Sequence, residues 1–278
     1  MSAYDYSKEK KFADSPIENK ERDYWLNKLS GEIQKTAFPY DRILIQSGED
    51  DYRAKSASCK LPQELFLRLV KLCKESDLKL HMTLTAGLIT LLHKYSGTND
   101  IIIGTPVLKQ QKQKDFINTV LALRNEIKDG MTFKTLLLQV RQSIIEATEN
   151  QNYPLETLIY KLNLPGTANG FPLFDVVILL ENIHTKDYIG HIKYNMLFSF
   201  QRLTDSIKVV IQYNPLLYKE TTIARIGEHF SNVLLAAVMN VDQPIPDLPA
   251  ISEKERHRLL FAWNDTGKEM VRDKCYHR

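Results

Sequence analysis

The stretch YSGTNDIIIGTP, residues 95–106, joins the end of one predicted element to the start of the next. The residues before it, from about 79 to 95, are apolar on all sides, which is typical of a buried helix, and Gly97 provides a stop signal. Residues 101–107 form a short β-branched run, which indicates a fully buried strand. The stretch therefore predicts a buried helix followed by a buried strand, as in an α/β fold.

Similar patterns extend on both sides of this stretch. Pro244, Pro246 and Pro249 disfavour regular structure and indicate a boundary near the end of the chain. Together, the expected helices and strands predict an α/β lobe, a two-layer sandwich in which helices cover a mixed β-sheet. Further helices are expected at residues 17–29, after Pro62, after Thr132, after Pro154 and at residues 220–239. Further strands are expected at residues 52–61, 119–127, 174–180, 191–200 and 206–213.

The composition is that of a globular protein and excludes several classes of function. The chain has 278 residues, of which 43% are hydrophobic and 26% charged, and its net charge is +3. Lys and Arg are dispersed among Asp and Glu, which disfavours nucleic-acid binding. The first residues are polar, unlike a secretory signal, and no run approaches the roughly 18 apolar residues of a membrane span. We therefore expect a soluble, cytoplasmic protein with no membrane partner.

No pattern of catalytic or metal-binding residues is complete in this sequence. The three cysteines are widely spaced, which supports neither a disulfide framework nor a zinc site, and no two of the seven histidines are adjacent. His81 and His93 fall on the buried helix, where a core hydrogen bond is the expected role. His184 and Asp187 lie between predicted strands, which indicates a turn. The residues alone therefore predict no catalytic group, no metal ligand and no self-contained active site.

Five segments resemble the motifs of one enzyme family, in the order in which that family has them. The first two are YWLNKLSG at residues 24–31, which is similar to YWxxxLSG, and residues 95–106, which are similar to YSGQxDIxxGTP. FINT at residues 116–119, followed by Arg124, resembles FVNTxxxR with one extra residue before the arginine. NQNYPLE at residues 150–156 resembles HQDYPFE, and FPLFD at residues 171–175 resembles the end of RNPLFD. The family is the condensation domains of nonribosomal peptide synthetases.

The resemblance implies a chloramphenicol-acetyltransferase-like fold, the fold of CoA-dependent acyltransferases, and covers the second half of such a domain. The family motif HHxxxDG, which lies in the N-terminal half, does not occur in this chain. We expect residues 1–14 to be a leader segment and residues 15–250 to be the C-terminal lobe. We expect residues 251–278 to be a linker and the first residues of an adenylation domain.

A condensation domain forms amide bonds between carrier-bound aminoacyl or peptidyl thioesters. The resemblance therefore implies that this chain does so only together with its missing N-terminal lobe, and that the chain alone is inactive. The expected partners are that lobe, the donor and acceptor peptidyl carrier proteins and the adjacent adenylation domain. No cofactor is expected to bind directly, because the carrier proteins supply phosphopantetheine.

The motif residues fall into two groups. The candidates for the substrate tunnel are Asn118, Thr119, Arg124 and Tyr153. Asn118 and Thr119 are either polar groups near the reacting centre or caps of strand ends, and Arg124 either pairs with a carboxylate or helps at the tunnel. The other motif residues are expected to shape turns, helix starts and core packing: Gly104, Pro106, Gln151, Pro154, Glu156, Pro172, Phe174 and Asp175.

Two other functions remain open at this point. The chain could be a non-catalytic lobe that docks carrier or adenylation domains without forming bonds. It could also be the C-terminal lobe of an epimerization domain, which shares the architecture, although the adenylation-like end of the sequence disfavours this.

Overall fold

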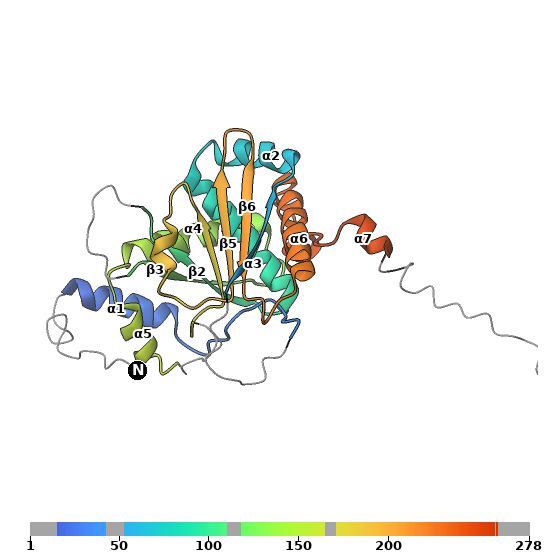
Figure 1. Cartoon of the computed structure of the whole chain (residues 1–278). Helices are drawn as coiled ribbons and strands as arrows, with labels where there is room; N and C mark the ends of the chain where they lie inside the picture. The colour runs from blue at the N-terminus through green and yellow to red at the C-terminus, as the bar shows by residue number, and fades with distance from the viewer. Residues whose placement is uncertain (1–15, 43–52, 110–117, 165–170, 259, 261–278) are drawn as a thin grey trace, which may run out of the picture.

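The computed structural model describes residues 16–42, 53–109, 118–164, 171–258 and 260 (Figure 1). The expected leader at residues 1–14, residues 116 and 117 of the FINT segment and the end of the chain from residue 261 lie outside this description. The described residues form an α/β lobe built on one mixed sheet, as predicted. None of its helices is long and apolar enough to cross a membrane.

The sheet places the predicted buried strands at its centre. In the part of the chain that the structure describes, its six strands have the order β1-β6-β5-β4-β2-β3. β4 is parallel to both of its neighbours, β2 and β5, and the other pairs are antiparallel. The strands are β1 (Lys55–Lys60), β2 (Asp100–Pro106), β3 (Val120–Glu126), β4 (Val176–Leu180), β5 (Met196–Arg202) and β6 (Ile207–Tyr213).

Four helices cover one face of the sheet, with α3 at their centre (Figure 1). They are α2 (Gln63–Cys73), α3 (Asp77–Ser96), α4 (Phe133–Glu149) and α6 (Glu220–Met239). α1 (Pro16–Lys28) and α5 (Leu155–Lys161) contact each other beside the β3 end of the sheet. Gly97 ends α3 in the left-handed region at φ 69°, and the Thr132 side chain accepts the N–H of Thr135 at the start of α4, so both predicted helix signals are confirmed.

The fifth predicted strand begins later than expected. Residues 191–195 form a turn and an irregular segment, and β5 starts at Met196. The Asn195 side chain donates to the Asp175 carboxylate at 2.6 Å, while the backbone N–H groups of Asn195 and Met196 both point to the Asp175 carbonyl. These contacts join distant residues, so the sequence of residues 191–200 does not reveal them. They fix where the strand can start.

The proline-rich segment after α6 is more ordered than its composition predicts. It contains a short 3₁₀ helix, η3 (Ile245–Asp247), and the side chains of Ile245 and Leu248 are buried. Lys94 on α3 donates to the carbonyl of Pro246 at 3.0 Å. A helix α7 (Glu253–His257) follows, inside the stretch expected to be a linker. Proline suits this segment because it fits the first turn of a 3₁₀ helix and the extended residues around it.

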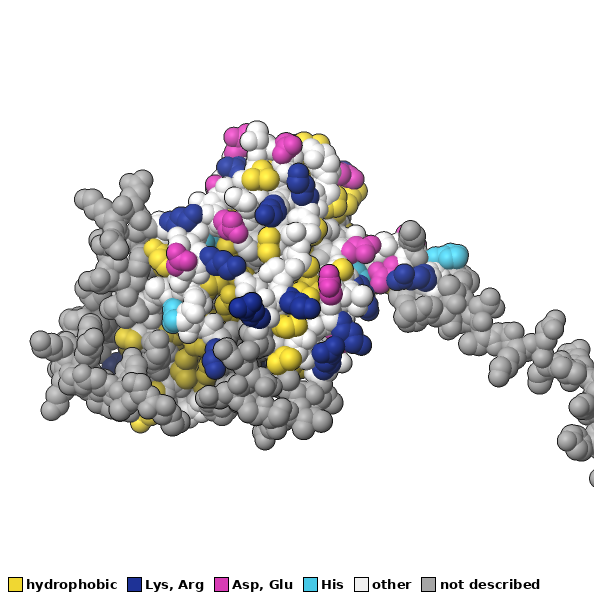
Figure 2. Space-filling view, viewed as in Figure 1, with side chains coloured by type: hydrophobic (Ala, Val, Ile, Leu, Met, Phe, Trp, Pro, Cys, Tyr) yellow, Lys and Arg dark blue, Asp and Glu magenta, His cyan; other side chains and the backbone are white. Residues whose placement is uncertain are grey.

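Exposed apolar side chains are scattered over the lobe. On the face shown in Figure 2, hydrophobic side chains lie among Lys, Arg, Asp and Glu. The most exposed large ones are Leu67 on α2, Leu138 on α4, Tyr160 on α5 and Met239 on α6. They stand on four different helices.

Candidate functional site

Asn118 joins the start of β3 to the loop that precedes α5. Its Nδ2 donates to the carbonyl of Gln151 at 2.9 Å and to the carbonyl of Tyr153, and its Oδ1 accepts the N–H of Leu155 at 2.8 Å. Pro154 at the N-cap makes no side-chain capping bond, so the Asn118 amide serves as the cap from a distant part of the chain. Three hydrogen bonds therefore hold this buried amide within the lobe.

Thr119 fastens a second loop to the same end of the sheet. Its hydroxyl donates to the carbonyl of Tyr188 at 2.6 Å, in the 3₁₀ helix η2 (Lys186–Ile189), and its carbonyl accepts the N–H of Val107 at 3.0 Å. Asn118, Thr119 and Tyr153 thus meet at the carboxyl end of β2. In open α/β sheets with parallel strands, ligands bind at such an edge.

Tyr153 has an unused donor in this group. Only 7% of its surface is exposed, and its hydroxyl has no hydrogen-bond partner among the described residues. Burying an unpaired hydroxyl costs about 1–3 kcal/mol. The hydroxyl is therefore a buried donor at this edge that could take a partner from elsewhere.

Arg124 lies away from the other three tunnel candidates. It is five residues beyond Thr119, roughly 16 Å for extended chain, toward the opposite end of the sheet. Its guanidinium binds the Asp100 carboxylate, with Nη2 2.6 Å from Oδ2, so the expected carboxylate partner is confirmed. It also donates to the carbonyls of Ser30 at 2.6 Å and Glu32 at 3.1 Å. The segment after α1 is held to β2 and β3 in this way.

The motif residues Gly104 and Phe174 fit together across the sheet. Gly104 on β2 has no side chain, and a Cβ there would lie 2.5 Å from Cε2 of Phe174. Phe174 is fully buried and packs against Phe171, with ring centroids 4.7 Å apart. The glycine is required because the ring occupies the space of its side chain.

Asp175 is the centre of a buried polar network that the sequence did not reveal. Its carboxylate is fully buried and lies 2.8 Å from Lys35 Nζ, 2.6 Å from Asn195 Nδ2 and 3.3 Å from the Tyr40 hydroxyl. Burial and the Asp175 charge raise the pKa of Tyr40, so its phenol remains a donor. No short motif contains Lys35, Tyr40 or Asn195, which come from two separate parts of the chain.

The remaining motif residues mark the ends of elements. Pro106 is the last residue of β2, Pro154 precedes α5, and Glu156 is its second residue. Gln151 contributes its carbonyl to Asn118, and Pro172 lies half-buried two residues before Phe174.

Comparison with known proteins identifies the family. The sequence model of the condensation domain family matches residues 2–260 of this chain. The chain belongs to the condensation domain family. It is 34% identical over 275 residues to a linear gramicidin synthase of Brevibacillus parabrevis, covering 91% of this chain and 4% of that protein. It is 30% identical over 292 residues to surfactin synthase subunit 1 of Bacillus subtilis (strain 168), covering 97% of this chain and 8% of that protein.

Solved condensation-type structures share the fold of this chain. The X-domain from teicoplanin biosynthesis matches with a TM-score of 0.71 and 21% identity, over 87% of this chain and 59% of that chain. The starter condensation domain of rhizomide synthetase matches with a TM-score of 0.62 and 15% identity, over 88% of this chain and 57% of that chain. The chain thus spans little more than half the length of these two solved chains.

Three histidines among the described residues make hydrogen bonds within the fold. His81 Nε2 lies 3.2 Å from the Thr105 hydroxyl, and His93 Nδ1 lies 2.9 Å from the Thr98 carbonyl, so both expected core hydrogen bonds are confirmed. His184 Nδ1 accepts the N–H of Leu180, which closes the expected turn after β4. Burial, together with neighbouring Lys109, lowers the pKa of His184 to about 4, and burial beside His184 holds the pKa of His81 well below its usual range. Both imidazoles are buried and neutral near pH 7.

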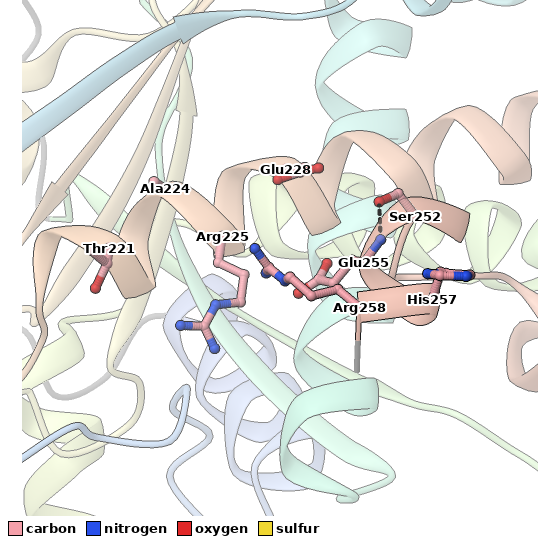
Figure 3. Close-up of a pocket in the computed structure, with 8 residues that line it drawn as sticks. All are labelled: Thr221, Ala224, Arg225, Glu228, Ser252, Glu255, His257 and Arg258. Carbon is pink, nitrogen blue, oxygen red and sulfur yellow. Dashed lines mark hydrogen bonds between the residues drawn. The ribbon is translucent and has the colours of Figure 1, made fainter. Parts of the chain in front are cut away.

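In the described part of the chain, the polar groups of the motifs hold loops in place. No group of three His, Cys, Asp or Glu side chains in these residues could hold a metal ion. A hollow of about 660 Å³ lies between α6 and α7, lined by Arg225, Glu228 and Arg258 among others, and the motif residues do not line it (Figure 3). The site that the motifs define is therefore an edge of the sheet whose loops are held in place.

Proposed function

We propose that this chain is the C-terminal lobe of a condensation domain and forms one wall of the tunnel in which a thioester becomes an amide. Residues 15–250 make up the lobe, and residues 251–278 lead through a linker into an adenylation domain. The reaction joins two carrier-bound aminoacyl or peptidyl groups. The opposite wall and the HHxxxDG histidines come from an N-terminal lobe.

One observation carries this proposal. The condensation model matches nearly the whole chain, yet no two histidines in the chain are adjacent, so HHxxxDG is absent. The limited share of the solved starter domain that the chain covers, 57%, supports the view that a second lobe completes it. A lobe with tightly held loops and no adjacent histidines fits the role of positioning the substrates.

Aminolysis of a thioester needs positioning more than it needs a strong catalyst. The acyl group is already activated, and the enzyme must hold the amine at attack distance, accept its proton and support the oxyanion. The edge formed by Asn118, Thr119 and Tyr153 is the candidate wall. The Tyr153 hydroxyl is buried and has no partner among the described residues, so it would donate to substrate, to a phosphopantetheine arm brought by a carrier protein, or to the second lobe once one of them reaches it.

The test combines this chain with an N-terminal lobe that carries HHxxxDG. Donor and acceptor carrier proteins are loaded with aminoacyl-phosphopantetheine, and the acceptor's intact mass reports amide formation. We expect product with both lobes and only background with this chain alone. An HHxxxDG variant of the second lobe is the negative control. Equal product from this chain alone would overturn the proposal.

A tyrosine pair tests the proposed wall. Tyr153→Phe removes the buried, unpaired hydroxyl, and we expect about tenfold slower amide formation without loss of stability. Tyr160→Phe is the matched control, because Tyr160 lies on α5 and is 76% exposed. Equal rates for the two variants would exclude Tyr153 from the wall.

A second candidate function is a lobe that binds another protein without catalysis. It is favoured by one structural neighbour, the X-domain in complex with OxyB from teicoplanin biosynthesis, which matches with a TM-score of 0.72 and 20% identity. Stable binding to carriers with no amide formation, even with the second lobe present, would favour this function.

A further inference from the structure

Three side chains from three different helices form a continuous hydrogen-bonded chain at the end of the lobe. The Tyr95 hydroxyl on α3 lies 2.7 Å from Nδ1 of His229 on α6, and Nε2 of His229 lies 2.8 Å from Oε2 of Glu255 on α7. The side chains of His229 and Glu255 are only 7% and 12% exposed. The two contacts therefore span from the core of the lobe to its last described helix.

The carboxylate fixes the direction of one of these bonds. It only accepts hydrogen bonds, so His229 donates through Nε2 to Glu255, and in the neutral imidazole Nδ1 accepts the hydrogen bond of the Tyr95 hydroxyl. Burial, with the Glu255 charge opposed by that of Arg225, raises the pKa of Tyr95 to about 12, so its phenol stays protonated. A protonated phenol is not a nucleophile near pH 7. We therefore assign the three hydrogen-bonded side chains a structural role, which is to join α7 to the other two helices.

α7 is a short helix whose described apolar flanks are partly exposed. A helix of five residues does not form by itself in water. Ile251 before α7 and Leu260 after it are 37% and 50% exposed, and the hollow of about 660 Å³ separates part of α7 from α6. Figure 3 shows Arg225 and Glu228 of α6 on one side of this hollow and His257 and Arg258 on the other.

Two further contacts support the start of α7. The Asn232 amide on α6 donates to the Ala250 carbonyl at 3.0 Å, and the Ser252 hydroxyl accepts the N–H of Glu255 at 3.2 Å (Figure 3). The first contact fixes the approach to the helix and the second caps it. Glu255 lies within α7 and joins it to the buried part of the lobe.

We propose that Tyr95, His229 and Glu255 form a latch that holds α7 on α6 and so sets the direction in which the chain leaves the lobe. The latch is built from residues of this chain and is independent of the proposed amide-forming activity. In a longer polypeptide, it would orient whatever domain follows.

Limited proteolysis of the chain tests the latch. Trypsin cleaves after Arg256 and Arg258, where the helical backbone fits the protease only when α7 opens. Hydrogen exchange reports the same opening at the amides of Glu255 and Arg256, which are hydrogen-bonded to Ser252. We expect Glu255→Ala to speed both by about tenfold or more, as for a lost hydrogen bond to a charged group. Glu253→Ala is the matched control, because it makes the same change on the same helix where the side chain is 90% exposed.

A double variant and the stability of the lobe test the latch further. In the double variant Tyr95→Phe with Glu255→Ala, the effects should be smaller than additive, because the two residues act through His229. Equal opening in Glu255→Ala and Glu253→Ala, or unchanged protection of α7 in Glu255→Ala, would overturn the proposal. The thermal transition of the lobe itself, followed by circular dichroism, should stay within about 2 °C in Glu255→Ala, which shows that only α7 has been released.

Discussion

Arg124 on β3 and Asp100 at the start of β2 form a two-pronged ion pair. Nε of Arg124 lies 3.0 Å from both carboxylate oxygens, and Nη2 lies 2.6 Å from Oδ2. The remaining N–H groups bind carbonyls of the segment after α1, so one side chain links three of the recognised motifs. An ammonium group cannot reproduce this planar arrangement of donors.

Replacing this arginine should therefore cost stability even when the charge is kept. We expect Arg124→Lys to lower the free energy of unfolding in urea by about 2 kcal/mol, as for lost hydrogen bonds to a charged group. The control is Lys128→Ala, whose exposed contact with Glu126 spans 3.9 Å and should contribute less than about 0.5 kcal/mol. Losses of equal size in the two variants would contradict a stabilising role for the Arg124 contacts.

The amide of Asn118 should control local order at the start of α5. Asn118→Ala leaves two carbonyls and the Leu155 N–H without their partner, which should cost about 2–3 kcal/mol and speed hydrogen exchange at Leu155. Asn152→Ala, in the same loop, removes a 3.3 Å hydrogen bond to the Glu21 carboxylate and should leave hydrogen exchange at Leu155 unchanged. Unchanged exchange at Leu155 in Asn118→Ala would show that the amide is dispensable for the fold.

Gly104 and Phe174 should behave as one packing unit. Gly104→Ala places a methyl group against the Phe174 ring and should destabilise the lobe by about 2 kcal/mol, as for overpacking. Phe174→Leu makes room, so the double variant should lose less than the sum of the two single losses. A double-mutant cycle in urea measures the coupling, and strictly additive losses would mean that the two sites are independent.

The buried histidines should make the lobe sensitive to mild acid. The pKa of His184 is about 4 in the folded protein against 6.5 for a free imidazole, because burial and Lys109 disfavour its charge. The unfolded chain therefore binds more protons between these values, so the stability is complete above about pH 6.5 and is lost progressively toward pH 4. A shift of this size corresponds to about 3 kcal/mol.

Urea unfolding between pH 4 and pH 7 measures this loss. We expect His184→Gln to flatten the pH dependence, while His191→Gln, an exposed histidine, should leave it unchanged. An equally steep loss of stability in His184→Gln would assign the acid sensitivity to other groups.

The sequence predicts the regular elements of this lobe well because their patterns are local. The span of α6 agrees with the predicted helix at both ends, and Gly97 ends α3 where it was expected. The site was harder to predict, since its hydrogen bonds join distant residues. Asn118 could be assigned as a cap of α5 only once β3 and the loop before α5 were placed side by side, and the partners of Asp175 lie in no motif. α7 was missed because a helix of five residues is too short to leave a periodic pattern in the sequence.

The most direct test of the central claim is the size of the native polypeptide. An antibody raised against this chain is used to probe an immunoblot of the source cells. A band far above 32.2 kDa is the result we predict, because the lobe would then work within a larger synthetase that supplies the histidines. A single band at 32.2 kDa would contradict this account and place the non-catalytic binding lobe first.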